Sequence, residues 1–234
     1  WIPDYMERYD PEALRYYLAA VMPEQKDTSF TWEDYVTRVN TELIGNLGNL
    51  FHRVISFAQK NFPDGLHADE CNLPELRDRV AEAHTKIDTA LAACKFKRGL
   101  AAMLELSQAT NAALNEVAPW KLLKQDRSAC ETQLVGFLNI CRSLSIMMSP
   151  YMPRTGETAW QYLGLSGTPQ EAGWEAVLNG ENDFTLQRPE PLFAKLDLQK
   201  VLEKEMPPNE LHKLKPEISF DDFKKLDIRV GTVT

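Results

Sequence analysis

The sequence lacks the long hydrophobic segments that mark a membrane protein. None of its apolar runs approaches the ~20 residues that a transmembrane helix requires. The opening stretch, WIPDYMERYD, contains neither the basic region nor the apolar region of a secretory signal peptide. It also lacks a starting methionine. We therefore expect a piece of a longer protein that works in the cytoplasm and has no membrane partner.

Cysteine is scarce, and its spacing excludes the common zinc sites. The four cysteines lie far apart and form no C-x-x-C pair, which zinc-binding sequences usually contain. Isolated thiols of this kind behave as small hydrophobic side chains in a reducing compartment. We expect buried, unpaired thiols and no metal site at Cys71, Cys94, Cys130 and Cys141.

Catalytic motifs are absent as well. The sequence has no glycine-rich phosphate loop, no dinucleotide-binding fingerprint, no G-x-S-x-G elbow and no H-E-x-x-H pair. Its four histidines are scattered along the chain. The sequence therefore predicts no catalytic residue and no cofactor-binding residue within this chain.

Positive charge is in deficit. The chain carries 26 Lys and Arg against 34 Asp and Glu, which gives a formal net charge of -8. Proteins that bind nucleic acid usually show a basic footprint, so the overall balance argues against such a partner. Net charge is an average over the whole molecule, however, and a local positive groove remains compatible with it.

Helix signals dominate the part of the chain before Leu165. Asp10 and Thr31 each precede a stretch with acidic residues in its first turn, which is typical of helix N-caps. The helix that begins after Thr31 is expected to continue to about Asn61. Its core stripe recurs at steps of three and four residues: Trp32, Val36, Val39, Leu43, Leu47, Leu50, Val54 and Phe57.

Further helices are predicted at about 73–94, 97–116, 128–150 and 153–165. In the third of these, Ser128 as N-cap and Glu131 three residues later fit a capping box. Helices of this length joined by short turns favour an all-α fold, an antiparallel helical bundle.

The chain changes character after Leu165. The stretch DFTLQRPEPLFAKLD reads as an extended segment that packs back on the bundle. A charged stretch punctuated by prolines follows and is typical of a short helix with a linker. The last residues, IRVGTVT, have the composition of a β-strand. Because one strand cannot form a domain, we expect a C-terminal extension that ends in a truncated β segment.

A polar stripe follows one flank of the long helix. Asn46, Asn49, Arg53 and Lys60 lie three, four and seven residues apart, which places them beside the core stripe. An amide and a guanidinium group both suit the edges of nucleobases, so Asn49 and Arg53 together are a candidate base reader. The alternative is an ordinary solvated helix face.

Two glycines interrupt the same helix. A glycine in a helix interior costs about 1 kcal/mol relative to alanine, so a compensating reason is needed. Gly45 and Gly48 have no side chain, and another group can approach the backbone there. That group is either RNA or a neighbouring helix, and we expect a helix.

A proline–tryptophan corner is the second candidate site. Pro119 ends a predicted helix, and Trp120 follows it directly. A tryptophan held at a corner can stack on an unpaired base, and Lys121 and Lys124 can meet phosphates. The alternative is a core tryptophan that fills the junction between two helices.

Four stretches, in this order, carry a resemblance to a known family: DPEALRYYLAAVMP, VNTELIGNLGNLFHRVISF, LNEVAPWKLLK and MMSPYMPRTGETAWQYLGL. Together they resemble the C-terminal part of methionyl-tRNA synthetase, a class I aminoacyl-tRNA synthetase. The resemblance covers about residues 1–196. It implies a stem-contact region at 1–31 and a helical anticodon-binding domain at 32–196. A linker would occupy 197–217, and residues 218–234 resemble the start of an OB-fold tRNA-binding domain.

The resemblance implies roles for three residues. Asn49 and Arg53 match helix positions that bind anticodon bases, and Trp120 matches the aromatic residue that stacks on the first anticodon base, cytosine. The partner would be the CAU anticodon loop of tRNA(Met). Asn46 and Lys60 match no motif of the family.

The parent enzyme would attach methionine to tRNA with ATP, in a catalytic region that precedes this chain and that carries the expected zinc ion. The fragment alone would be inactive and contain no cofactor. The OB-fold appendix often mediates dimerisation in the family. Because it is cut here, we expect the fragment to be a monomer.

Two alternatives stay open at this point. A proline–tryptophan corner also occurs in the related valyl, isoleucyl and leucyl synthetases, which would prefer other anticodons. A helical protein-interaction module is the alternative from another class, and the acidic balance of the chain favours it.

Overall fold

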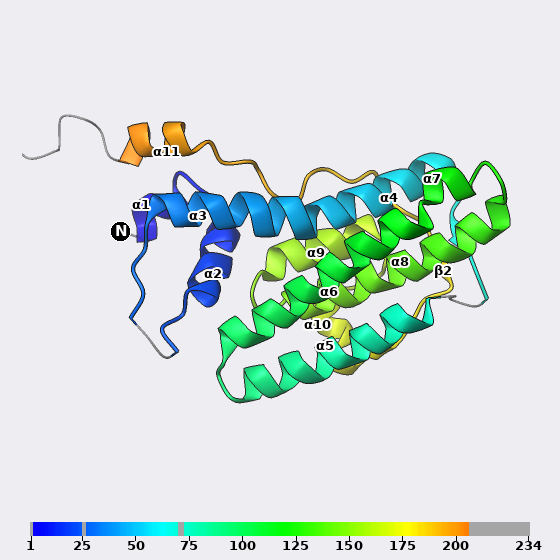
Figure 1. The fold of residues 1–234 in the computed structure, drawn as a ribbon, viewed down its shortest axis with the longest axis horizontal. Coiled ribbons are helices and arrows are strands. Elements are labelled where there is room, and N and C mark those ends of the chain that lie inside the picture. The colour runs from blue at the N-terminus through cyan, green and yellow to red at the C-terminus, as the bar shows by residue number, and fades with distance from the viewer. Residues whose placement is uncertain (1, 25–26, 70–72, 206–234) are drawn as a thin grey trace, which may run out of the picture. The chain divides into compact units, whose positions relative to one another are not determined.

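The computed structural model describes residues 2–24, 27–69 and 73–205 (Figure 1). Helices dominate these residues, which confirms the all-α class. The described strands, β1 (Leu66–His67) and β2 (Asp183–Phe184), are two residues long and pair antiparallel, with Leu66 opposite Phe184. The chain divides into two compact units, residues 1–196 and 197–234.

The first unit begins with two short helices, α1 (Ile2–Met6) and α2 (Pro11–Ala20). The predicted cap is present, because the Asp10 carboxylate accepts a hydrogen bond from the Glu12 backbone N–H at 3.0 Å. Burial falls on Tyr16 and Tyr17 of α2, whereas Leu18 is exposed.

The long helix spans the predicted residues without a break, but its middle segment is π-helical and not α-helical. It consists of α3 (Trp32–Arg38), the π-helical segment η1 (Val39–Gly48) and α4 (Asn49–Asn61). The Thr31 hydroxyl caps it as predicted, accepting from the Asp34 N–H at 3.2 Å. The expectation of one uniform α-helix is therefore wrong in its middle third, where the turns are wider. A π-helix joins residues five apart, and such segments are rare and frequent at functional sites.

The remaining long helices form the bundle. The antiparallel pair α5 (Pro74–Ala92) and α6 (Phe96–Val117) packs beside α8 (Arg127–Met148), against which α9 (Pro153–Tyr162) lies (Figure 1). Helix α8 is the centre of the core, since every residue from Ile140 to Met148 is buried. These helices confirm the predicted antiparallel bundle.

The predicted capping box at Ser128 is wrong. The N-cap of α8 is Asp126, whose carboxylate accepts from the Ala129 N–H at 2.9 Å. Glu131 reaches outward, and its carboxylate accepts the backbone N–H of His67 at 3.0 Å. A tertiary contact has therefore taken the side chain that the local pattern assigned to the cap.

Short elements complete the first unit: α7 (Pro119–Leu122), α10 (Pro169–Ala172) and the 3₁₀-helix η2 (Trp174–Leu178). Residues 185–196 then run as an extended segment along the bundle, as predicted. Phe193 is buried, and the amide of Asn40 exchanges two hydrogen bonds with the backbone of Leu196, at 2.8 and 3.0 Å.

The second unit begins with α11 (Leu198–Glu205), the short helix expected in the charged stretch. The rest of the linker and the OB-fold segment, residues 218–234, lie outside the described residues. Within the described ranges, no helix combines the length and the apolar character needed to cross a bilayer.

Candidate nucleic-acid interface

Trp120 stands at a sharp corner between two helices. Ala118, which ends α6, adopts a left-handed conformation with φ 45, and Pro119 starts α7 directly after it. A left-handed alanine is strained and persists only where the surrounding structure imposes it. The side chain of Trp120 is 39% exposed, so the interpretation as a core residue is wrong. The corner instead presents a large aromatic side chain at the surface.

Arg53 of α4 lies against this tryptophan. Its guanidinium carbon is 5.5 Å from the centroid of the Trp120 ring, which is within cation–π distance. The same guanidinium donates a hydrogen bond of 2.7 Å to the side-chain oxygen of Asn115 on α6. Arg53 of α4 thus contacts α6 and α7, which follow each other directly but lie far from α4 in sequence.

Asn49 lies one helical turn before Arg53 and is exposed. Its amide nitrogen is 3.5 Å from the side-chain oxygen of Asn111, one turn before Asn115 on α6. Two pairs therefore run side by side across α4 and α6, Asn49 with Asn111 and Arg53 with Asn115. Sequence reasoning missed the two α6 asparagines. Their four-residue spacing, equal to that of Asn49 and Arg53, was the available signal.

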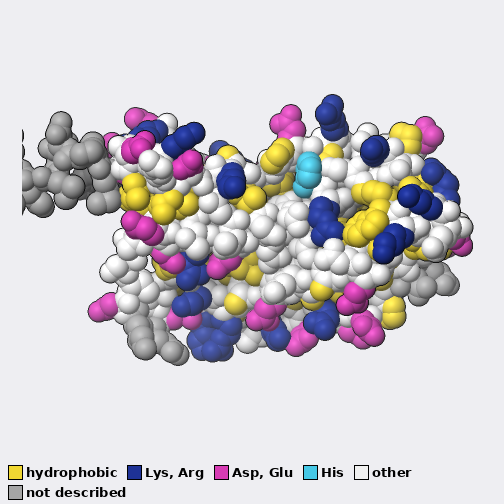
Figure 2. Space-filling model, turned by 45° about the horizontal axis from the view of Figure 1, so that its top comes forward, with side chains coloured by type: hydrophobic (Ala, Val, Ile, Leu, Met, Phe, Trp, Pro, Cys, Tyr) yellow, Lys and Arg dark blue, Asp and Glu magenta, His cyan; other side chains and the backbone are white. Residues whose placement is uncertain are grey.

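A cavity of about 310 Å³ opens beside Trp120. Its described lining contains cationic side chains and apolar side chains but no acid, although the chain as a whole is acidic. Figure 2 shows hydrophobic side chains bordered by Lys and Arg on this part of the surface, with acidic side chains mainly farther away. The lining residues are His52, Arg53, Val54, Ser56, Phe57, Lys60, Leu114, Pro119, Trp120 and Leu134.

The polar stripe is not one uniform solvated face. Lys60 is exposed and lines the cavity, and Asn49 is exposed at the start of the same helix. Asn46 is partly buried and directs its side chain into α6, where it bonds the carbonyl of Leu104 at 3.0 Å. The stripe therefore divides into outward-facing residues and one inward-facing amide.

Both glycines lie in the π-helical segment, at positions where a side chain would crowd the backbone. A Cβ on Gly45 would lie 3.3 Å from the carbonyl oxygen of Asn40, and one on Gly48 would lie 3.1 Å from that of Leu43. Both carbonyls precede the glycine by five residues, so each glycine relieves crowding within the wide turns. The Phe193 ring would also lie 3.3 Å from a Cβ on Gly48. The nearest group outside the long helix is Phe193 of the extended segment for Gly48, and for Gly45 no such group of the described residues lies within 4 Å of the added Cβ. The expectation of a neighbouring helix is therefore wrong for both glycines.

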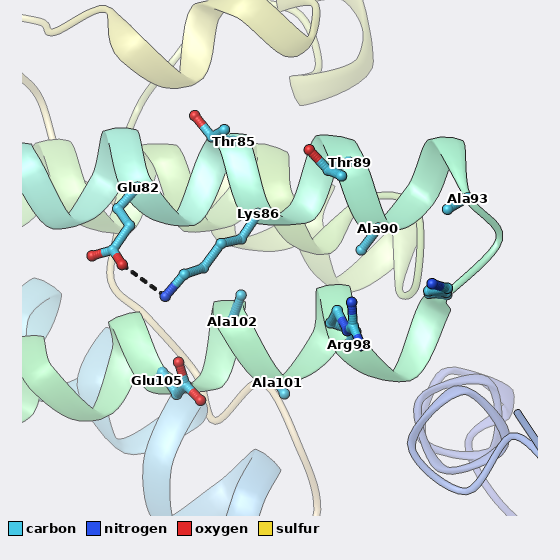
Figure 3. Close-up of a pocket in the computed structure, with 11 residues that line it drawn as sticks. Glu82, Thr85, Lys86, Thr89, Ala90, Ala93, Arg98, Ala101, Ala102 and Glu105 are labelled. Atoms are coloured by element: carbon cyan, nitrogen blue, oxygen red, sulfur yellow. Dashed lines mark ion pairs between the residues drawn. The ribbon is translucent and has the colours of Figure 1, made fainter. Parts of the chain in front are cut away.

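A second pocket lies between α5 and α6 and contains the 2.8 Å ion pair of Glu82 with Lys86 (Figure 3). It contains no histidine or cysteine among its described lining residues. No group of three His, Cys, Asp or Glu side chains in the described ranges is arranged to hold a metal ion.

Cys130 and Cys141 are buried, and burial raises the pKa of both thiols. Cys94 is exposed in the α5–α6 turn, so the expectation of a buried thiol is wrong there, and Cys71 lies outside the described residues.

Comparison with models of known protein families identifies the family of this chain. The model described as the anticodon binding domain of methionyl tRNA ligase matches residues 63–205, more than half of the chain. The chain belongs to this family. A second model, described as tRNA synthetases class I (M), matches residues 1–55. The methionyl assignment therefore takes precedence over the valyl, isoleucyl and leucyl alternatives.

Curated relatives agree with the family match. The methionine–tRNA ligase of Methanopyrus kandleri is 33% identical over 240 residues, which covers 100% of this chain and 36% of that protein. The Archaeoglobus fulgidus and Chloroflexus aggregans ligases are each 34% identical, covering 100% and 88% of the chain. The chain thus spans just over a third of the length of these relatives.

Solved structures show the same fold. The apo form of Mycobacterium tuberculosis methionyl-tRNA synthetase matches with a TM-score of 0.74 at 23% identity, covering 83% of this chain and 40% of that one. The structure of that enzyme bound by methionyl-adenylate matches with a TM-score of 0.73 at 22% identity, covering 82% of this chain and 39% of that one.

Proposed function

We propose that this chain is the anticodon-reading part of a methionine–tRNA ligase and that it binds the CAU anticodon loop of tRNA(Met). Proteins read RNA sequence mainly on single-stranded loops, where unstacked bases are held on aromatic side chains and bonded along their edges. The surface around Trp120 offers both kinds of contact. An exposed indole lies beside a guanidinium, with an amide one helical turn away.

Each residue takes a distinct role in this proposal. The cytosine at the first anticodon position stacks on the exposed part of Trp120, which is worth about 1–3 kcal/mol. Arg53 and Asn49 bond base edges or the adjacent phosphates, since a guanidinium and an amide suit both acceptors. The cavity beside Trp120, which has Arg53 and Lys60 but no acid in its described lining, attracts the RNA backbone. The local charge thus compensates for the acidic average of the chain.

The chemical step belongs to the parent enzyme. The relatives are ligases almost three times as long, and one solved neighbour is bound by methionyl-adenylate, the product of methionine and ATP. We therefore assign ATP, methionine and the expected zinc ion to residues outside this chain. The bundle contributes by holding the anticodon while the acceptor end reaches that region. Dimerisation of the parent through the OB-fold appendix is part of the same proposal.

The observation that carries the proposal is the contact of Arg53 with an exposed Trp120 on a surface without acidic lining. The test is the affinity of the 234-residue chain for a CAU anticodon stem-loop and for a stem-loop with another base at the first position. The unsubstituted chain should prefer the CAU stem-loop. Trp120→Ala and Arg53→Ala should each bind it at least tenfold more weakly than the unsubstituted chain. Lys204→Ala, on α11, serves as a charge control and should bind like the parent.

Equal binding of the two stem-loops by the parent would refute the proposal. Folded Trp120→Ala and Arg53→Ala variants that bind like the parent would refute the assigned residues. Circular dichroism confirms that each variant retains its helices. Absence of any RNA binding, combined with capture of a protein ligand at the same surface, would instead support the protein-interaction alternative.

A further inference from the structure

Asn46 is the inward-facing amide of the π-helical segment η1. Its amide nitrogen donates to the Leu104 carbonyl at 3.0 Å, and its side-chain oxygen accepts from the Ser107 hydroxyl at 2.9 Å and from the Asn111 amide at 3.2 Å. The Asn111 amide also bonds the Asn46 carbonyl at 3.1 Å. Ser107 is fully buried, so Asn46 satisfies a donor that has no access to water.

This network continues to the proposed RNA-reading residues. Asn111 accepts the amide of Asn49 at 3.5 Å, and one turn farther along α6, Asn115 accepts the guanidinium of Arg53 at 2.7 Å. Asn46 therefore fixes the part of α6 from which both partners of the reading residues project. Asn46 itself is partly buried, and its side-chain bonds go to Leu104, Ser107 and Asn111 of α6.

A π-helical segment needs contacts that stabilise it against a change to α-helical hydrogen bonding. The N–H of Asn49 bonds the carbonyl of Ile44, five residues earlier, at the junction with α4. A return of this turn to α-helical bonding would move all following side chains by one position, which is about 100° of rotation. Asn49 and Arg53 would then leave the face that meets Asn111 and Asn115. Hydrogen bonds from η1 to a neighbouring helix select one register over the other.

We propose that Asn46 is a positioning residue for anticodon recognition, which holds the π-helical register and thereby directs Asn49 and Arg53 toward the RNA. The inference rests on the proposed function for its biological meaning. Its geometric part, the dependence of the Arg53–Trp120 contact on Asn46, concerns the free protein and is tested without RNA.

The first experiment is NMR of the free chain. The side-chain Nε–H signal of Arg53 and the indole signal of Trp120 report their contact, since the ring shifts nearby protons. Asn46→Ala should move both signals. Thr41→Ala, an exposed position in the same segment, should move neither, because the Thr41 hydroxyl bonds the Thr37 carbonyl of its own helix at 2.8 Å. Asn46→Asp keeps an acceptor for Ser107 and Asn111 but replaces the amide donor to the Leu104 carbonyl with a carboxylate oxygen, and it should therefore move both signals as well.

The second experiment measures RNA discrimination. Asn46→Ala should bind the CAU stem-loop about tenfold more weakly than the parent and lose most of the preference over a stem-loop altered at the first anticodon base. Thr41→Ala should keep both the affinity and the preference. A purely structural role would lower the free energy of unfolding but leave the preference of the folded protein for the CAU stem-loop unchanged.

The outcomes separate the two proposals. Unchanged Arg53 and Trp120 signals in folded Asn46→Ala overturn the positioning role, whatever the parent binds. Shifted signals together with a parent that does not prefer CAU overturn the proposed function while the control of the Arg53–Trp120 geometry by Asn46 stands. Shifted signals with an unchanged CAU preference in Asn46→Ala also overturn the positioning role in recognition.

Discussion

The guanidinium carbon of Arg53 lies 5.5 Å from the centroid of the Trp120 ring, and a hydrogen bond of 2.7 Å to Asn115 holds it there. This relationship joins α4, α6 and α7 at one surface. The arginine is bound on one side by an amide and on another by an aromatic ring, so its planar group has a defined direction before any ligand arrives. Preorganisation of this kind lowers the entropy that binding must remove.

Arg53→Lys should separate geometry from charge. Lysine keeps the positive charge but lacks the planar fork that bonds two acceptors at once. We expect the affinity for the CAU stem-loop to fall about tenfold while its dependence on salt concentration stays that of the parent. Arg53→Gln should additionally reduce the slope of log affinity against log salt by about 0.7, the value for one contact to a single strand. The measurement is binding across a series of potassium chloride concentrations. Parent-like affinity of Arg53→Lys would contradict a directional role.

Asn115→Ala should weaken RNA binding because it releases the guanidinium of Arg53. It removes the 2.7 Å hydrogen bond that holds the Arg53 guanidinium, which then samples more conformations. We expect about threefold to tenfold lower affinity for the CAU stem-loop, which corresponds to the net value of about 0.5–1.5 kcal/mol for one ordinary hydrogen bond. Gln108→Ala, an exposed position on the same helix, is the matched control and should bind like the parent. Equal affinities of the two variants would show that Arg53 needs no support from α6.

Phe193→Ala should destabilise the bundle. The ring is buried beneath the extended segment and packs against Gly48, where a Cβ would lie 3.3 Å from it. Truncation of a buried phenylalanine costs about 3–5 kcal/mol in free energy of unfolding, and we expect about 3 kcal/mol here. Urea unfolding followed by circular dichroism measures the change. Leu178→Ala, at a side chain that is 48% exposed, should change the free energy by no more than about 0.5 kcal/mol.

His67 should titrate above its ordinary range. Its ring nitrogens lie 2.7 Å from an oxygen of Asp183 and 3.2 Å from one of Asp69, and these hydrogen bonds raise the pKa of the imidazole above 6.5. Since the folded pKa is the higher one, the stabilisation is fully present below pH 6.5 and is lost as the pH rises through the folded pKa. An NMR titration of the ring protons measures this pKa.

Substitution of each carboxylate in turn shows which one raises the pKa of His67. Asp183→Asn should return most of the His67 pKa toward 6.5, because the Asp183 contact is the larger contribution. Asp69→Asn should have the smaller effect. A parent-like titration in Asp183→Asn would mean that the pairing of β1 with β2 does not set the charge of His67.

Local sequence predicted much of the secondary structure. Asp10 and Thr31 cap their helices as expected, because a short polar side chain beside a free N–H acts within three residues. The same rule misplaced the start of α8, where Asp126 lies two residues before Ser128 and has an equally good capping side chain. Glu131, which a capping box at Ser128 would require, bonds the backbone N–H of His67 instead.

The candidate site was predictable only in part. The spacing of Asn49 and Arg53 follows from helical periodicity, but their partners Asn111 and Asn115 depend on which face of α6 meets α4. Trp120 fitted a core role equally well, since its exposure depends on how three helices pack at the corner. The roles of Asn49, Arg53 and Trp120 in reading an anticodon stay predictions.

By itself, the sequence determined the all-α class, the helix order and the positions of most helix boundaries, because caps, prolines and apolar periodicity act over a few residues. Tertiary structure alone decided the π-helical register of Val39–Gly48. The buried positions inside the segment, Val39, Leu43 and Leu47, lie four residues apart, a spacing that fits both an α-helix and a π-helix, so the choice depends on contacts from outside the segment. Those contacts are the bonds of Asn40 to Leu196, the ring of Phe193 on Gly48 and the bonds of Asn46 to α6.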